Sequence, residues 1–259
     1  MNILITNDDG INADGLIELK KSLEDEHNVF VIAPLKEQSG SSHSLTMNMP
    51  LRVYEYGKNF YAVDGTPTDC VMLGLNKIFE GIKFDLLISG INYGANLGDD
   101  ITYSGTVAGA MEGCLMGLPS IALSIDVDFQ KRPVYVHYES AIKFLKILIS
   151  NGLNFKKDTF LNINVPDKPF QEIKGIKVTR QGKRTYKDVI VENTDPRGQK
   201  YYWIAGTPVI LCKDEDTDIY AVENSYVSVT PIKMDLTDYN FMEELTKFLT
   251  NKDFFNSAR

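Results

Sequence analysis

The first 34 residues, 1-MNILITNDDGINADGLIELKKSLEDEHNVFVIAP-34, decide the fold class. Residues 2–6 and 28–34 are short apolar runs with β-branched side chains, as in buried strands. Between them Leu16, Leu19 and Leu23 recur at helical spacing. A strand, a helix and a second strand form a βαβ unit, which implies a parallel sheet. This stretch therefore predicts an α/β protein.

The same alternation continues to about residue 170. Further strands are expected at residues 84–90, 119–124 and 159–166, and helices over residues 65–79, 104–117 and 135–150. The helix over 104–117 is made largely of small residues and ends at a glycine. Residues 1–170 are therefore expected to form an α/β core.

The alternation of predicted strands and helices ends after residue 170. Residues 176–206 and 223–232 resemble extended, twisted β segments with turn residues between them. In the closing helix over 241–250, Phe241, Leu245 and Phe248 share one face. We expect this β arm and helix, within residues 171–259, to pack against another surface such as a second subunit. Without repeats or a flexible linker, residues 1–259 are expected to be one domain with an extension.

Composition narrows the class of protein. The 259 residues are 43% hydrophobic and 24% charged, as in ordinary globular proteins. No apolar run of about 18 residues predicts a membrane span, and no secretory signal opens the chain. Cys70, Cys114 and Cys212 are widely spaced without a CxxC pair, which predicts buried thiols in a reducing cytoplasm. The net charge of −8 argues against duplex nucleic acid but not against a small phosphorylated substrate.

Unusual side chains follow the first two strands, at the sheet edge where ligands bind in open parallel sheets. Asp8 and Asp9 come directly after residues 2–6. Adjacent carboxylates repel each other, and burial makes either one harder to ionise. Such a pair needs a cation, hydrogen-bond donors or open water. Ser39, in the hydroxyl-rich loop after residues 28–34, is a possible weak oxygen ligand at the same edge.

The most informative loop is 89-SGINYGANLGDDITYSGTVAGAMEG-113. Its glycines at 90, 94 and 98 alternate with Asn92 and Asn96, and their spacing matches neither GxGxxG nor a P-loop. Glycines let a backbone approach a ligand closely, and asparagine amides offer both oxygen ligands and donors. Ser104 is expected to cap the following helix, so that the amides of Gly105 and Thr106 are free to face an anion.

Together the three loops supply only hard oxygen ligands. Two carboxylates, a hydroxyl and an amide carbonyl favour Mg²⁺ or Mn²⁺ over zinc. Such an ion keeps positions open for water and a phosphate oxygen, and it lowers the pKa of bound water. The chemistry therefore points to metal-dependent phosphomonoester hydrolysis.

Five motifs in order resemble the SurE family, the survival-protein nucleotidases: ILITNDDGINADGL (3–16), VIAPLKEQSGSSHSLT (31–46), DGTPTDCV (64–71), SGINYGANLGDDITYSGTVAGAMEG (89–113) and YVSVTPIKMDLT (226–237). The resemblance implies a Rossmann-like three-layer core. It also implies a 5′/3′-nucleotidase that removes phosphate from nucleoside monophosphates with one divalent cation, and some members also act on short polyphosphate. A β arm and a C-terminal element exchanged between subunits would form dimers or tetramers.

The resemblance also assigns roles to residues. It implies Asp8, Asp9, Ser39 and Asn92 as metal ligands, and Asn96 with the Ser104, Gly105 and Thr106 turn around the phosphate. Asp8, Asp9 and Asn96 are the candidate catalytic residues. One departure is His43, at a position where many members have another residue, and we interpret it as a solvated loop histidine. His27 and His137 are expected to be structural.

Two mechanisms and three rival classes stay open at this point. Either a metal-activated water attacks phosphorus directly, oriented by Asp8 or Asp9, or one of these aspartates forms an aspartyl-phosphate. A phosphorelay receiver domain would need a third aspartate where residues 84–92 carry serine and asparagine. A non-catalytic nucleotide-binding module is a second rival. A dinucleotide-dependent oxidoreductase lacks its glycine fingerprint here.

Overall fold

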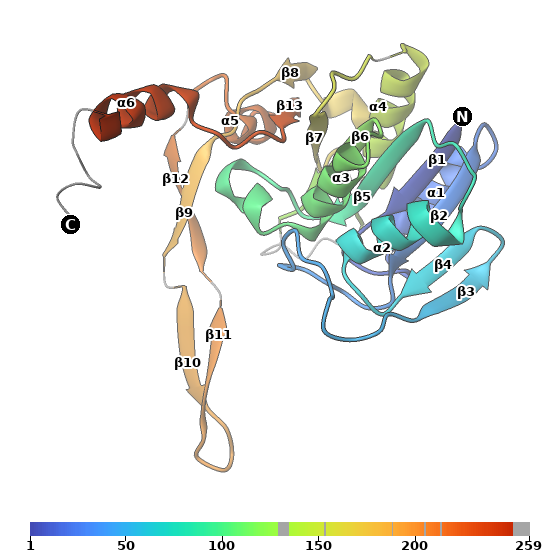
Figure 1. Ribbon diagram of the computed structural model, residues 1–259, viewed down its shortest axis with the longest axis horizontal. Helices are drawn as coiled ribbons and strands as arrows, with labels where there is room; N and C mark the ends of the chain where they lie inside the picture. The colour runs from blue at the N-terminus through green and yellow to red at the C-terminus, as the bar shows by residue number, and fades with distance from the viewer. Residues whose placement is uncertain (129–134, 153, 188, 205, 213, 251–259) are drawn as a thin grey trace.

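The computed structural model describes residues 1–128, 135–152, 154–187, 189–204, 206–212 and 214–250. A nine-stranded sheet forms the centre, in the order β3-β4-β2-β1-β5-β6-β7-β13-β8 (Figure 1). Its strands are β1 (Asn2–Thr6), β2 (Asn28–Pro34), β3 (Val53–Gly57), β4 (Phe60–Val63), β5 (Leu86–Tyr93), β6 (Ser120–Asp126), β7 (Thr159–Pro166), β8 (Ile176–Val178) and β13 (Val227–Lys233). The run from β4 to β7 is parallel throughout, which confirms the predicted α/β class.

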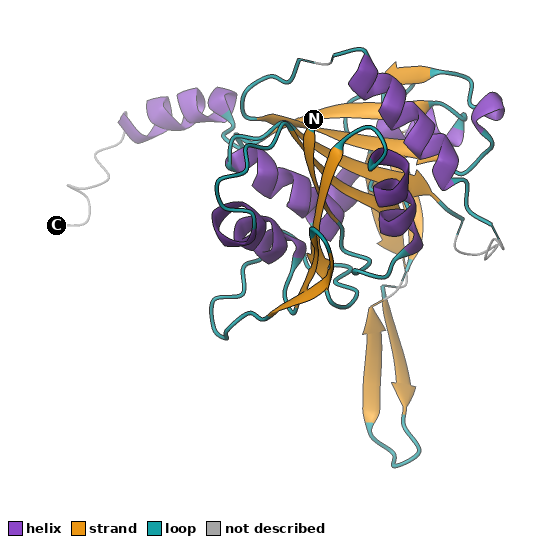
Figure 2. Ribbon diagram, turned by 90° about the vertical axis from the view of Figure 1, so that its right-hand side faces the viewer, coloured by secondary structure: helices purple, strands orange, loops and turns teal. Residues whose placement is uncertain are grey.

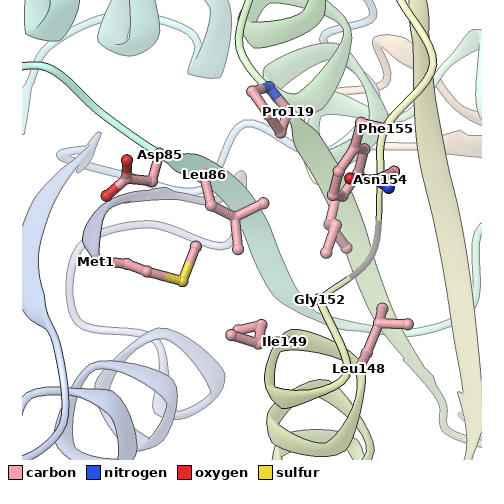
Figure 3. Close-up of a pocket in the computed structure, with 10 residues that line it drawn as sticks. Met1, Asp85, Leu86, Pro119, Leu148, Ile149, Gly152, Asn154 and Phe155 are labelled. Atoms are coloured by element: carbon pink, nitrogen blue, oxygen red, sulfur yellow. The ribbon is translucent and has the colours of Figure 1, made fainter.

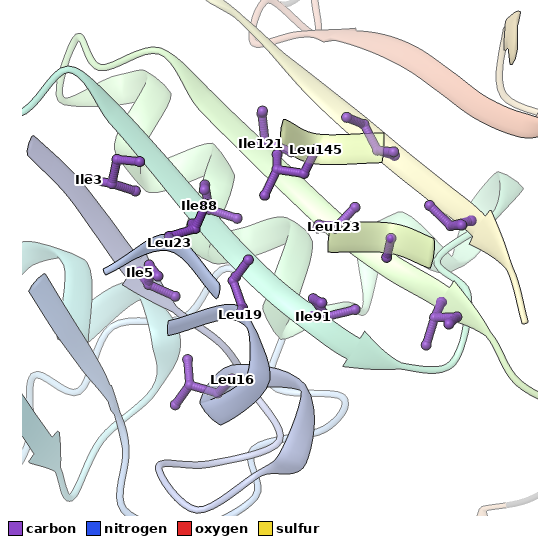
Figure 4. Close-up of a cluster of buried hydrophobic side chains, with 14 of the residues drawn as sticks. Ile3, Ile5, Leu16, Leu19, Leu23, Ile88, Ile91, Ile121, Leu123 and Leu145 are labelled. Carbon is purple, nitrogen blue, oxygen red and sulfur yellow. The ribbon is translucent and has the colours of Figure 1, made fainter. Parts of the chain in front are cut away.

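Helices cover both faces of this sheet. They are α1 (Asp14–Leu23), α2 (Pro67–Leu73), α3 (Gly105–Leu115), α4 (Tyr138–Ser150) and α5 (Asp218–Glu223), whereas α6 (Tyr239–Thr250) buries no residue. The alternation along β1 explains the layers: Ile3 and Ile5 pack in the cluster that contains residues of α1 and α4, whereas Leu4 packs with residues of α2. Figure 4 shows the first cluster. Each fully buried side chain of this kind contributes about 1.5–3 kcal/mol.

The predicted helices form, with shifted ends. α2 begins after a capping box of Thr66 and Asp69 and continues as a π-helix, Gly74–Ile78, so the expected segment 65–79 is helical without being one α-helix. Ser104 caps α3 as predicted, because its hydroxyl accepts the Val107 amide at 3.1 Å. α4 begins at Tyr138 rather than at residue 135. None of the described helices is both long and apolar enough to span a bilayer.

The C-terminal third contains more than an arm. The return of β13 into the main sheet was not predicted; it lies there antiparallel to β7 and parallel to β8. In the N-terminal half, the hairpin of β3 and β4 was not predicted either. Outside the main sheet, β9 (Lys183–Lys187) pairs with β12 (Thr207–Cys212), and β10 (Ile190–Thr194) pairs with β11 (Lys200–Ile204). Figures 1 and 2 show this arm extending away from the core, with α6 projecting separately.

Candidate active site

The candidate site lies where the chain changes direction across the sheet. β1 has β2 on one side and β5 on the other, and all three strands are parallel. Their carboxyl ends therefore meet at a topological switch point, where open α/β sheets bind ligands. A cavity of about 230 Å³ lies there. It is lined by Asp8, Ser39, Gly40, Asn92, Tyr93, Gly94, Ala95, Asn96, Asp100, Tyr103 and Ser104.

Asp8 is a buried carboxylate tied to the start of α3. Its side chain is only 4% exposed, and its Oδ1 accepts a hydrogen bond from the Thr106 hydroxyl. Burial raises the pKa of Asp8, while the Thr106 hydroxyl and the amides of Thr106 and Gly105 act in the opposite direction. The helix N-terminus that was expected to face a bound anion thus faces the Asp8 carboxylate.

Gly105 is needed for this close approach. A Cβ at this position would lie 2.7 Å from the Asp8 Cβ, 2.8 Å from the Ser41 Oγ and 2.9 Å from the Asp8 Oδ2. A side chain would therefore push Asp8 or the loop carrying Ser41 away from α3. The glycine acts here by packing, since the helical backbone itself is ordinary.

Asp9 does not line the cavity itself, but it binds the backbone of Tyr93, which does. Its Oδ2 accepts the Tyr93 backbone amide at 2.9 Å. Burial and the neighbouring Asp8 raise the pKa of Asp9 to about 7, with a smaller contribution from Glu37, and the Tyr93 amide opposes the rise. The Tyr93 amide is thus the donor that offsets burial and the neighbouring acid at Asp9, whereas Asp8 has the donors at the start of α3.

Ser39 approaches the cavity from the loop after β2. It is exposed, and its Oγ donates to the Glu37 Oε1 at 2.9 Å. Sequence reasoning missed Glu37, which adds a third acid to the electrostatics around Asp9. The sequence could have indicated Glu37 only by its position two residues before Ser39, the candidate ligand.

Asn92 and Asn96 have different surroundings. The Asn92 Nδ2 donates to the Gly94 carbonyl at 2.7 Å, which fixes the amide and leaves its Oδ1 for another partner. Asn96 is buried, and its Nδ2 donates to the Ser124 Oγ at 2.8 Å. The backbone of Asn96 is held by Asn162 and Asn164 of β7.

Sequence reasoning missed Asn162 and Asn164. Both are fully buried, and their amide nitrogens donate to the Asn96 carbonyl at 2.8 and 3.0 Å. The sequence contained an indication of both residues, because two asparagines alternate with apolar residues in a strand that is otherwise mostly hydrophobic. Buried amides need partners, and here the partner is the loop that carries Asn96.

The glycine–asparagine loop is also fixed at its far end. Fully buried Asp218 accepts the Gly98 amide at 2.8 Å and the amides of Gly182 and Ile219 at 2.7 and 2.8 Å. It therefore joins the site loop to the base of the arm and to α5. Nothing in the sequence identified Asp218 beforehand.

Histidine 43 is not simply solvated, as the sequence suggested. Its Nε2 lies 2.8 Å from the Oε2 of Glu112, a buried carboxylate on α3. A buried acid needs a polar partner, and the loop supplies one. His137 is structural as expected, with its Nδ1 2.9 Å from the Asp167 Oδ1. His27 is partly buried beside β2.

A larger cavity of about 310 Å³ lies at the opposite edge of the sheet (Figure 3). Its lining includes Leu86, Leu148, Ile149 and Phe155. The carboxylate in its wall, Asp85, already accepts the Asn2 amide at 2.8 Å. This mostly apolar cavity lacks the cluster of carboxylate, amide and hydroxyl oxygens that lines the smaller one, so the smaller cavity is the candidate active site.

The fold and the site define an α/β protein of the Rossmann-like type with an oxygen-lined, acidic centre at its switch point. The sequence model of the family described as "Survival protein SurE" matches residues 3–188. The chain therefore belongs to the SurE family.

Individual relatives agree with this membership. The "5′-nucleotidase SurE" of Pelobacter propionicus is 47% identical, over 96% of this chain and 100% of that protein. The protein of the same name from Geotalea daltonii is 49% identical, over 96% of this chain and 99% of its own length. The crystal structure of the SurE protein from Aquifex aeolicus superposes with a TM-score of 0.83 at 44% identity, covering 96% of this chain and 99% of that one.

Proposed function

We propose that this protein is a divalent-metal-dependent 5′/3′-nucleotidase that hydrolyses nucleoside monophosphates to nucleoside and phosphate. The observation that carries the proposal is the adjacent pair Asp8 and Asp9: Asp8 lines a cavity together with Ser39, Asn92 and Ser104, and Asp9 accepts the backbone amide of Tyr93 in its wall. Relatives at 47% and 49% identity bear the name 5′-nucleotidase SurE.

The donor set fits a hard divalent cation. Asp8, Asp9, Ser39 and Asn92 would hold it, because each offers an oxygen and Mg²⁺ and Mn²⁺ prefer such ligands. Among the described residues, no group of three or more histidines, cysteines and acids is arranged to hold a metal. Two carboxylates with neutral oxygens would leave coordination positions for water and substrate. When bound, the ion supplies Lewis acidity and lowers the pKa of a water.

The protein's own groups divide the remaining work. The Thr106 hydroxyl holds the Asp8 Oδ1, which fixes the orientation of that carboxylate. Asp8 or Asp9 would orient the attacking water and accept its proton. Asn96 and Ser104, which line the cavity, would surround the phosphoryl group and offset its charge in the transition state. The amides of Gly105 and Thr106, expected from the sequence to face the phosphate, face the Asp8 carboxylate instead. Asn162 and Asn164 keep Asn96 in register for this role.

The experiment that tests the function is phosphate release from a panel of substrates. The panel contains 5′- and 3′-nucleoside monophosphates with different bases and a short polyphosphate, each with Mg²⁺, Mn²⁺ or EDTA. We expect release from nucleoside monophosphates with a metal and none with EDTA. Release that is indifferent to EDTA would overturn the metal assignment. Binding of AMP without release would instead support a nucleotide-binding module.

A second experiment distinguishes the two mechanisms. In a single turnover in H₂¹⁸O, direct attack places the label only in phosphate. An aspartyl-phosphate that is hydrolysed at phosphorus also labels phosphate, but it leaves a covalent acyl phosphate that borohydride traps. We expect no trapped adduct at Asp8 or Asp9. A trapped adduct at either aspartate would refute direct attack.

The protein is also expected to act as a homodimer or homotetramer in the cytoplasm. Apolar side chains are exposed on the arm and on α6, among them Tyr202, Trp203, Phe241 and Leu245. Exposed apolar patches of this kind mark association surfaces, and a second copy of the chain is the occupant that we propose. The free thiols of Cys70, Cys114 and Cys212 suit a reducing compartment.

A further inference from the structure

The candidate cavity is too small to enclose a whole nucleotide. Its volume of about 230 Å³ lies below the roughly 300–1,000 Å³ of pockets that bury most of a drug-sized ligand. Asp8, Asn92, Asn96 and Ser104 line its polar part, where the phosphate would sit under the function proposed above. The rest of a substrate would therefore extend to the rim.

An aromatic ring stands on that rim. Tyr103 lines the cavity directly next to Ser104, yet 68% of its surface is exposed. Within the part of the chain that the structure describes, no hydrogen bond or ring contact engages its side chain. An exposed aromatic face next to a phosphate site is suited to receive the flat face of a base.

The backbone under this ring is well fixed. The Ser42 amide donates to the Tyr103 carbonyl at 3.0 Å, and the Ser42 hydroxyl donates to the Thr102 carbonyl at 2.6 Å. The Tyr103 amide donates to the Asp100 carbonyl at 3.0 Å. The ring thus projects from a turn whose backbone is held by Ser42, in the loop after β2, and by Asp100, so binding would not need to order this part of the backbone.

The acidic residue next to this ring in the cavity wall already has partners. The Asp100 carboxylate, which also lines the cavity, is ion-paired with Arg184 and accepts the Tyr186 hydroxyl at 2.6 Å. Both partners come from β9 at the base of the arm. The charge of Asp100 is therefore compensated by Arg184, and Tyr103 offers an exposed aromatic surface beside the entrance.

We propose that Tyr103 is the base-stacking platform of the site, which binds the nucleobase of a nucleoside monophosphate by its ring face without selecting one base. This proposal rests on the proposed nucleotidase function. Stacking is tolerant of sequence because every base has a π-face, so the residue favours nucleotides over phosphate esters that lack a base.

The test compares AMP and UMP with ribose 5-phosphate, which carries the phosphate and the sugar but no base. We expect Tyr103→Ala to lower the ratio of kcat/KM for each nucleotide to that for ribose 5-phosphate by about 5-fold to 100-fold. Tyr103→Phe keeps the ring and is expected to keep the ratio. An unchanged ratio in Tyr103→Ala, or an equal loss for all three substrates, overturns the proposal while leaving the nucleotidase function standing.

A second variant gives a readout that does not depend on turnover. Tyr103→Trp places an indole at the rim, and the wild-type protein, whose single tryptophan is Trp203 on the arm, serves as the background. We expect AMP with Mn²⁺ to quench the added emission and ribose 5-phosphate with Mn²⁺ not to. Size-exclusion chromatography accompanies each variant: dissociation of the oligomer by Tyr103→Ala would assign the ring to a subunit contact instead. A wild-type protein that releases no phosphate from AMP would overturn the proposed function separately.

Discussion

The hydroxyl of Thr106, in the first turn of α3, donates a hydrogen bond to the carboxylate of Asp8, which follows β1 98 residues earlier in the chain. The contact joins two of the three loops at the switch point. Because Asp8 is only 4% exposed, its carboxylate is largely shielded from water. The Thr106 hydroxyl and the adjacent backbone amides therefore provide the hydrogen bonds that solvent would otherwise supply. The start of α3 therefore determines how Asp8 is presented to a ligand.

Removing this hydroxyl should weaken the proposed metal site. Thr106→Val keeps the shape of the side chain but deletes the donor, which raises the pKa of Asp8 further. We expect the Mn²⁺ concentration that gives half-maximal phosphate release to rise about 10- to 100-fold, as when a group that orients a metal ligand is lost. Thr106→Ser keeps the donor and is the matched control. Equal Mn²⁺ dependence in Thr106→Val and Thr106→Ser would contradict the assignment.

Asp9→Asn is expected to abolish turnover and leave the fold intact. The amide is isosteric with the carboxylate, but it removes one of two charges from the proposed ligand set. Far-UV circular dichroism should be unchanged, and the rise in Tm that Mn²⁺ causes in the wild-type protein should disappear. The exposed Asp25→Asn is the matched control. Near-normal phosphate release by Asp9→Asn would be fatal to the metal assignment.

The stability of the metal-free protein should fall as pH rises. The pKa of Asp9 is about 7 in the folded protein, against an ordinary value of 3.8 for an exposed aspartate, so between these pH values the folded state binds more protons than the unfolded state. The free energy of unfolding then decreases from about pH 4 to about pH 7, by up to about 4 kcal/mol from this group.

Urea unfolding in EDTA between pH 4.5 and 8 measures this effect. Asp9→Asn lacks the titrating group, so its stability relative to the wild-type protein should increase with pH across the window. A stability difference that does not change with pH would rule out the predicted linkage. Excess Mn²⁺ should flatten the decline in the wild-type protein, because the metal binds the ionised carboxylate.

Asp218 should be important for both stability and substrate binding. Asp218→Asn keeps one oxygen acceptor and turns an NH₂ group toward backbone donors, so at least one buried amide loses its partner. We expect a loss of about 1–3 kcal/mol in the free energy of unfolding, and a higher KM because the loop that carries Asn96 is released. Asp216→Asn, at an exposed ion pair with Arg180, should change stability by less than about 1 kcal/mol. Equal effects of the two substitutions would refute the anchoring role.

The apolar face of α6 should be needed for assembly. Leu245→Glu places a charge on the face that Phe241 and Leu245 share, and both side chains are about half exposed in the single chain. We expect this variant to elute as a smaller species in size-exclusion chromatography with light scattering. Lys247→Glu changes charge on the same helix away from that face, and it should elute as the wild-type protein does. Identical masses for the two variants would exclude α6 from the interface.

Much of the fold followed from local pattern. The apolar runs of β1 and β2 predict buried strands, and the leucine spacing of α1 predicts a helix between them. Two strands joined by a helical crossover in one sheet are parallel, so the parallel order follows from the same stretch. The cap at Ser104 was predicted for the same reason, since a cap is a contact between residues three apart. The antiparallel return of β13 was not, because strand pairing over 60 residues leaves no local signature.

For the site, the sequence by itself determined which loops carry oxygen-bearing side chains, the proposed ligands among them, and that these loops belong at one edge of a parallel sheet. Only the tertiary structure decided which groups hold those ligands in place: Thr106 against Asp8, Asn162 and Asn164 under Asn96, Asp218 behind Gly98, and Glu112 opposite His43. The physical reason is that buried polar groups must find partners, and which partners they find depends on how distant segments pack.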